Sequence, residues 1–169
     1  MRSENGFTLI ELILILTILG IAVSGLMLYF IKGVGSGHQS QQRTTAVTLA
    51  QDLLEEIHSK CWDETSASVS PCQGAVTASS IGSDGGESRA TYDDVDDFNG
   101  LNNTPPINSQ GSSMSSFSGY NQQVSVCYVD VADLNTCKGS GTSDFKKIVV
   151  DIYYGGGQKT ELVTVVANY

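Results

Sequence analysis

The sequence is poor in basic residues and in histidine. It contains nine Lys and Arg against 18 Asp and Glu, which gives a formal net charge of −9 at pH 7. The basic residues are scattered singly, apart from Lys146 and Lys147. Because phosphate binding requires clustered Lys and Arg, this pattern argues against nucleic acid as a partner.

The sequence also lacks the motifs of common catalytic sites. It has no glycine-rich phosphate loop and no serine in a nucleophile elbow. Its only histidines, His38 and His58, lie in polar stretches of helical character, where solvated side chains are expected. We therefore expect that this protein is not an enzyme.

Charge is nearly absent from Phe7 to Ile31, where Glu11 is the only charged side chain. A helix of this length rises ~1.5 Å per residue and can cross a hydrocarbon core of ~30 Å. A carboxylate inside such a helix costs ~2.5–3.5 kcal/mol at the bilayer centre, which makes it a candidate functional residue. No basic residue lies within helical reach of Glu11 on its own chain, yet a buried carboxylate needs a partner.

Two plain interpretations of this segment are open. The first is a secretory signal peptide, with small residues for cleavage at 22–24. However, the apolar run continues to Ile31, and signal cores do not usually contain an internal glutamate. The second is a membrane anchor in which Glu11 has no role, with Arg2 holding the N-terminus in the cytoplasm.

A third interpretation comes from the sequence GFTLIE at residues 6–11, followed by the apolar run. This combination closely resembles the class III signal of type IV pilins and pseudopilins. In that family a prepilin peptidase cuts after the glycine and N-methylates the new first residue. The resemblance implies cleavage between Gly6 and Phe7, methylation of Phe7, and removal of residues 1–6 as a leader peptide.

The resemblance also implies a role for Glu11 in assembly. In a filament of this family, the glutamate is expected to neutralise the N-terminal amine of Phe7 in a neighbouring subunit. Two buried charges that are each costly alone compensate each other when they meet. The implied partners are other pilin subunits, the prepilin peptidase, the inner-membrane assembly platform and, before assembly, membrane lipid. The implied location is the bacterial inner membrane, as a single-pass protein with a periplasmic globular part, and then the pilus fibre at the cell surface.

Hydrophobic periodicity predicts that the helix continues beyond the membrane. Residues 7–31 would form the apolar transmembrane or filament-core half, and residues 32–60 an amphipathic continuation. Glycines at 33, 35 and 37 weaken the junction by ~1 kcal/mol each relative to alanine. Six apolar residues share one helix face: Ala46, Leu49, Ala50, Leu53, Leu54 and Ile57.

The remaining residues, 61–169, are expected to form the globular region. Residues 61–121 hold all three prolines and are rich in Ser, Gly, Asn, Asp and Thr, which indicates a variable loop with a short strand near 74–80. Residues 122–169 are predicted to form a three-stranded antiparallel meander. Its expected strands are 123–131, 147–153 and 160–167, with a glycine turn at 155–157. The predicted fold is α+β, a long N-terminal helix packed by its second half on a small antiparallel β-sheet.

Four cysteines in a chain with an export-type N-terminus predict two disulfides and an oxidising compartment. Four cysteines allow three pairings. We favour Cys61–Cys72 and Cys127–Cys137, because each bond closes a short loop and would contribute ~2–3 kcal/mol. The alternative is a metal site that uses His58, Cys61 and Cys72, although the sequence contains no CxxC pair.

The segment 89–103 concentrates acidic and amide side chains. Its oxygen ligands suit Ca²⁺, and the candidates are Asp94, Asp96, Asp97 and Asn99. The EF-hand pattern fails when the loop is counted from Asp94, because Phe98 occupies the fifth position and no glutamate occupies the twelfth. A solvated acidic turn with helix caps is the other interpretation, so we expect no cofactor and keep calcium as the alternative.

Residues 49–57, 61–64 and 92–100 look like parts of the D-type minor pilins of the mannose-sensitive haemagglutinin (MSHA) pilus. This resemblance implies a structural minor subunit of a type IV pilus that is used in surface adhesion. The alternative is a pseudopilin of a type II secretion system, because both classes share the N-terminal signal.

Overall fold

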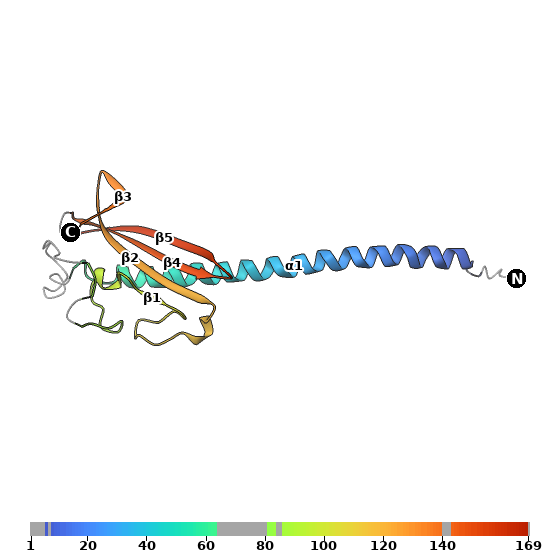
Figure 1. Ribbon diagram of the computed structural model, residues 1–169, viewed down its shortest axis with the longest axis horizontal. Coiled ribbons are helices and arrows are strands. Elements are labelled where there is room, and N and C mark those ends of the chain that lie inside the picture. Colours follow the sequence, from blue (N-terminus) through green and yellow to red (C-terminus); the bar gives the residue numbers. More distant parts are fainter. Residues whose placement is uncertain (1–5, 7, 64–80, 84–85, 140–142, 169) are drawn as a thin grey trace. The chain divides into compact units, whose positions relative to one another are not determined.

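The computed structural model describes residues 6, 8–63, 81–83, 86–139 and 143–168 (Figure 1). The chain divides into two units, residues 1–41 and residues 42–169, and each is described by itself below. The long helix α1 spans Leu9–His58. It is followed by two 3₁₀ turns and five strands: η1 (Asp96–Phe98), β1 (Asn102–Asn103), η2 (Ser115–Phe117), β2 (Tyr120–Asp130), β3 (Asp133–Lys138), β4 (Phe145–Tyr154) and β5 (Gln158–Ala167).

The helix α1 begins just after Thr8, whose Oγ1 accepts a hydrogen bond from the backbone N–H of Glu11 at 3.4 Å. A threonine in this position satisfies one of the free N–H groups of the first turn. The helix is continuous through the glycines at 33, 35 and 37. It contains no proline, so each of these glycines weakens the helix without removing a backbone hydrogen bond.

The five strands form one antiparallel sheet, in the order β1-β2-β4-β5 with β3 paired to β2. The α+β prediction is confirmed, and the expected three-stranded meander is incomplete because it omits β1 and β3. Both strands lacked a local signal. All six residues of β3 are exposed, so it has no apolar alternation, and β1 is only two residues long. The expected short strand at 74–80 lies outside the described residues.

The core lies between the sheet and the part of α1 that follows residue 42 (Figure 1). Along β4 every second side chain is buried, which is the pattern of a strand with one face covered. The predicted stripe on the helix meets this face. The buried residues that the two elements and β2 contribute include Ala46, Leu49, Ala50, Leu53, Ile57, Val124, Val126, Ile148, Val150 and Ile152.

The expected glycine turn joins β4 to β5. Gly155, Gly156 and Gly157 have φ angles of 54°, 81° and 109°, in the region that favours glycine. A Cβ atom on Gly155 would also lie 2.9 Å from Oε1 of Gln42 on α1. Glycine at 155 therefore permits both the turn and its close approach to the helix.

Candidate functional site

The first half of α1 exposes apolar side chains around its whole circumference, from Leu9 to Ile31. By length and composition this stretch can cross a membrane. Its hydroxyl groups bond within the helix. Thr17 Oγ1 donates to the Leu14 carbonyl at 2.9 Å, and Ser24 Oγ donates to the Ile21 carbonyl at 2.9 Å. The segment therefore presents apolar side chains outward, and the hydroxyl groups of Thr17 and Ser24 are satisfied within the helix, as a hydrocarbon environment requires.

Glu11 lies exposed in the first turn of this helix. The positive end of the helix dipole favours a carboxylate in this position. Among the described residues no cation forms an ion pair with Glu11, and the next basic residue along the helix is Lys32. Phe7, on which the expected cleavage and methylation depend, lies outside the described residues, whereas Gly6 is described and exposed.

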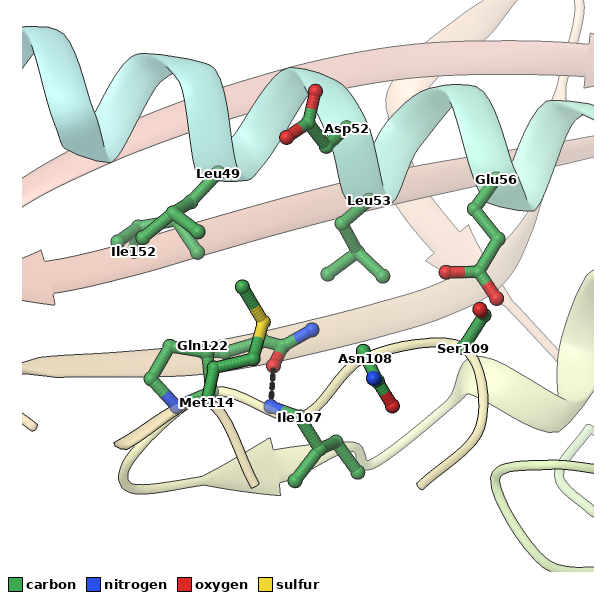
Figure 2. Close-up of a pocket in the computed structure, with 11 residues that line it drawn as sticks. Leu49, Asp52, Leu53, Glu56, Ile107, Asn108, Ser109, Met114, Gln122 and Ile152 are labelled. Atoms are coloured by element: carbon green, nitrogen blue, oxygen red, sulfur yellow. Dashed lines mark hydrogen bonds between the residues drawn. The ribbon is translucent and has the colours of Figure 1, made fainter. Parts of the chain in front are cut away.

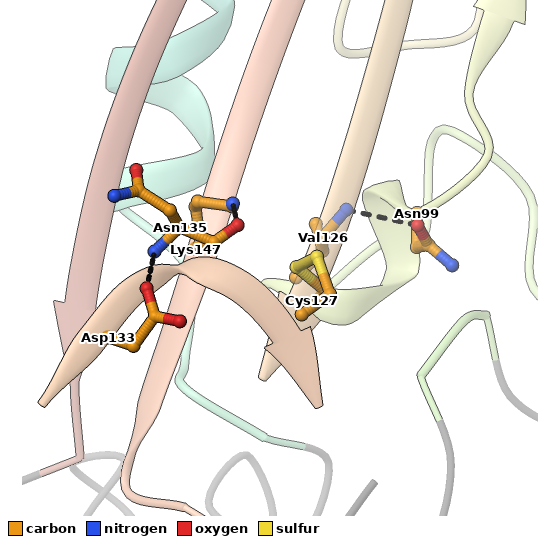
Figure 3. Close-up of a disulfide and its surroundings, with 7 residues drawn as sticks. Asn99, Val126, Cys127, Asp133, Asn135 and Lys147 are labelled. Atoms are coloured by element: carbon orange, nitrogen blue, oxygen red, sulfur yellow. Dashed lines mark hydrogen bonds between the residues drawn. A yellow bond between two sulfur atoms is a disulfide. The ribbon is translucent and has the colours of Figure 1, made fainter. Parts of the chain in front are cut away.

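Cys127 and Cys137 form a disulfide with a Cα–Cα distance of 5.6 Å, which joins β2 to β3 (Figure 3). This is the pairing that the sequence favoured for these two residues. Cys61 is also disulfide-bonded, which argues against the alternative metal site because a bridged sulfur is not a thiolate. Its expected partner, Cys72, lies outside the described residues. His58, the third member of that metal site, is exposed.

Three aspartates of the acidic segment are buried, so the interpretation as a solvated turn is wrong for these side chains, whereas Asp93 and Asn99 are exposed. Asp94, Asp96 and Asp97 are only 2%, 5% and 2% exposed. Oδ1 of Asp94 accepts hydrogen bonds from the backbone N–H groups of Asp96 at 2.9 Å and Asp97 at 3.2 Å. Oδ2 of Asp97 accepts the N–H groups of Asp93 at 2.9 Å and Asp94 at 3.2 Å. These reciprocal bonds replace the water that the carboxylates lose on burial.

The four candidate calcium ligands all bond to other groups of this chain. Besides the bonds of Asp94 and Asp97, Oδ1 of Asp96 lies 2.6 Å from Lys146 Nζ. Oδ1 of Asn99 accepts a hydrogen bond from the backbone N–H of Val126 at 3.0 Å (Figure 3). The structure thus uses this set to hold the segment against the sheet. A different acidic group, Glu87 with Asp93 and Asp97, has carboxylate oxygens within 4.8 Å of one another, but proximity of acids alone does not define a metal site.

Sequence reasoning missed the buried lysine at the centre of this region. Lys146 has 0% exposure, and its Nζ lies 2.5 Å from the Trp62 carbonyl oxygen, 2.6 Å from Asp96 Oδ1 and 3.4 Å from Asp63 Oδ2. Nζ also lies 4.2 Å from the centre of the Trp62 ring and 5.5 Å from that of Tyr128. The sequence does contain an indication of this burial. Lys146 lies on the face of β4 that is turned to the core, where the other residues are mostly apolar.

A second missed ion pair joins the start of the acidic segment to α1. Arg89 is 6% exposed and forms two hydrogen bonds with the Glu56 carboxylate, at 2.7 and 2.5 Å. Its guanidinium also stacks over Phe98, 4.8 Å from the ring centre. No local pattern marks this pair, because the two residues are far apart in the sequence.

A cleft of about 200 Å³ lies between α1 and the loop that follows β1 (Figure 2). Its lining is mostly apolar and includes Leu53, Met114 and Ile152. Oε1 of Gln122 accepts a hydrogen bond from the backbone N–H of Ile107 at 2.9 Å, which holds the loop against β2. The described residues that line the cleft include no histidine, cysteine or lysine, and we assign it no catalytic role.

Residues 1–27 match a family model described as the prokaryotic N-terminal methylation motif. Comparisons with curated proteins and with solved structures returned no match. The motif supports a type IV pilin-like or pseudopilin-like structural subunit rather than an enzyme. Together with the apolar first half of α1, it supports membrane anchoring, assembly with other pilin subunits and processing by a prepilin peptidase.

Proposed function

We propose that this protein is a structural minor subunit of an MSHA-like type IV pilus, used in surface adhesion. The observation that carries the proposal is Glu11, a single carboxylate in an exposed apolar helix, inside the matched methylation motif. Its pairing requirement is met by a second subunit. The prepilin peptidase removes residues 1–6 and methylates Phe7, and the globular region remains in the periplasm until assembly.

In this proposal the glutamate sets the register of assembly. A subunit that leaves the bilayer settles where Glu11 meets the amine of Phe7 in its neighbour. Neither charge alone is stable in an apolar filament core, because desolvation costs several kcal/mol per ion. The apolar side chains from Leu9 to Ile31 then exchange lipid for the helices of other subunits.

The experiment compares Glu11→Ala with wild type in a strain that lacks the chromosomal copy. The neighbour's amine would lose its carboxylate, a loss of ~3–5 kcal/mol for a buried pair. The variant should therefore accumulate in the inner membrane as cleaved subunit and enter sheared fibres poorly. The readout is the ratio of subunit in purified fibres to subunit in the inner membrane. Glu55→Ala, which removes an exposed charge from the second half of the same helix, is the matched control.

Equal incorporation of Glu11→Ala and wild type would contradict the register role. Mass spectrometry of the N-terminus tests processing separately, with a mature chain expected to start at N-methylated Phe7. A start after residue 24 would instead indicate a signal peptide. Deletion of the gene distinguishes the two classes of machine: loss of surface fibres fits a pilus, and loss of protein secretion fits a type II pseudopilin.

A further inference from the structure

Lys146 and Asp96 differ from the solvent-exposed ion pairs of the described part of the chain. The side chains of Lys138 and Asp130 are 42% and 41% exposed, whereas those of Lys146 and Asp96 are 0% and 7% exposed. In the buried pair an amine nitrogen lies 2.6 Å from a carboxyl oxygen, shielded from bulk water. An amine and a carboxyl group held in contact are the two reactants of an amide.

We propose that Lys146 and Asp96 become joined by an isopeptide bond that the folded chain forms on itself. The bond would link Nζ of Lys146 to Cγ of Asp96. The proposal concerns the region of residues 42–169 and does not depend on the function proposed above.

The groups around Lys146 Nζ are arranged for attack on this carboxyl. The ammonium first transfers one proton to the Asp96 carboxylate, along their 2.6 Å contact. The Trp62 carbonyl oxygen at 2.5 Å and Asp63 Oδ2 at 3.4 Å accept the two hydrogens that remain on nitrogen. The nitrogen lone pair is then directed towards Asp96.

Asp94 is placed to act as the general acid and base. Burial raises the pKa of its carboxyl to about 8, so it carries a proton at neutral pH, and it is hydrogen-bonded to the Asp96 side chain. Oδ1 of Asp94 already accepts two backbone N–H groups, so Oδ2 is the oxygen that presents the proton to Asp96. A protonated neighbour makes the Asp96 carbonyl carbon more electrophilic.

The step balances as a condensation. Nζ forms a bond to Cγ of Asp96, and the resulting tetrahedral carbon then loses its hydroxyl group. Asp94 gives its proton to that hydroxyl and receives the remaining proton from nitrogen, so one water molecule leaves and no charge or oxidant is consumed. In water the condensation is unfavourable. Fixed reactants can provide effective molarities of ~10⁵–10⁸ M, and this contact holds the two groups in place.

The surroundings favour the amide over the ion pair. The rings of Trp62 and Tyr128 lie against Nζ and shield it from water. Burial also raises the pKa of the Asp96 carboxyl although Lys146 is beside it, which favours the neutral acid that the reaction needs. The bond would fasten η1 to β4 and hold the acidic segment against the sheet.

The test is peptide mapping of the wild-type full chain, purified from membranes, then reduced, alkylated and digested with trypsin. The sequence places Asp96 in the peptide 90–138, and Lys146 in the peptide 139–147 when its amine is part of an amide, because trypsin then does not cut after Lys146. We expect one branched species that contains both peptides, with a mass lower than their sum by one water molecule. Fragmentation should locate the junction at Asp96 and Lys146. Because neither peptide contains the N-terminus, processing does not affect the result.

Three variants and one control, Lys147→Met, assign the roles. Lys146→Met and Asp96→Ala should give only separate peptides. Lys147→Met, which changes the neighbouring residue outside the buried cluster, should retain a branch, in which the peptide 139–159 replaces 139–147 because trypsin has no site at residue 147 in this variant. Asp94→Asn should lose the bond and keep the fold, as judged by the Cys127–Cys137 disulfide. Persistence of the branch in Asp94→Asn would overturn the role of Asp94. Separate peptides in wild type, with Lys146 cleaved by trypsin, would overturn the proposal outright and leave an ion pair.

Discussion

The two units of the chain differ in whether a charged group in apolar surroundings has a partner within the described part of the chain. In residues 1–41, Glu11 lies among apolar side chains and has no cation beside it in the described part of the chain. In residues 42–169, Lys146 is fully buried and contacts three oxygen acceptors of its own chain. The difference indicates that the globular region satisfies its buried charges internally. In the function proposed above, the N-terminal helix depends instead on a partner that another molecule supplies.

This contrast has an energetic basis. Breaking a buried pair leaves an uncompensated charge and is strongly destabilising. The loss of one partner therefore shifts the equilibrium in which the pair forms. For Lys146 that equilibrium is folding of the globular region. For Glu11, in the proposed function, it is the transfer of a subunit from lipid to the filament.

The largest expected effect on folding comes from Lys146→Met. Relative to the ion-paired form of the chain, the substitution keeps most of the side-chain volume but leaves the Asp96 and Asp63 carboxylates without their cation, and it should lower the free energy of unfolding by ~3–5 kcal/mol. The measurement is denaturant unfolding of the detergent-solubilised chain, followed by the fluorescence of Trp62, its only tryptophan. Lys147→Met is the control and should shift the free energy by less than ~0.5 kcal/mol. Similar shifts for the two variants would contradict the importance of the buried cluster.

The next effect is a pH dependence that comes from Asp94. Its pKa is raised from the usual 3.8 to about 8, mainly by burial, so the native state holds a proton that the unfolded chain releases. The contribution of Asp94 to the free energy of unfolding is greatest below pH ~4. It declines as the pH rises towards ~8, by at most ~1.4 kcal/mol per pH unit. Asp94→Asn cannot release this proton, so its unfolding free energy should fall less between pH 5.5 and pH 7.5. Parallel pH profiles for the variant and wild type would exclude this assignment.

The smallest expected effect is that of Glu11→Ala on the globular region. Because Glu11 is exposed in the first turn of α1, the unfolding free energy should change by less than ~0.5 kcal/mol. The same Trp62 fluorescence assay measures it. A loss comparable to that of Lys146→Met would mean that Glu11 has a partner within its own chain, and the contrast between the two units would fail.

Features whose interacting residues are close together in the sequence could be predicted, and features whose residues are far apart could not. The helix, its buried stripe and the glycine turn at 155–157 depend on neighbours within a few residues, and their periodicity was visible in the sequence. The strand β3 was not predicted, because its residues are all exposed and show no apolar alternation. The predicted disulfide between Cys127 and Cys137 does join β3 to β2. The burial of Asp94, Asp96 and Asp97 was not predicted, because a dense run of aspartates has the composition of a surface loop.

The sequence by itself determined the N-terminal segment: an apolar helix, one carboxylate and a motif in which Gly6, Phe7 and Glu11 lie within six consecutive residues. This was possible because a membrane or filament segment is defined by its local composition and spacing. Only the tertiary structure decided the partners of Lys146. Asp96 precedes it by 50 residues and Asp63 by 83, and no periodicity of a helix or strand relates positions so far apart. Such contacts arise only when packing of the sheet on α1 brings the three segments together.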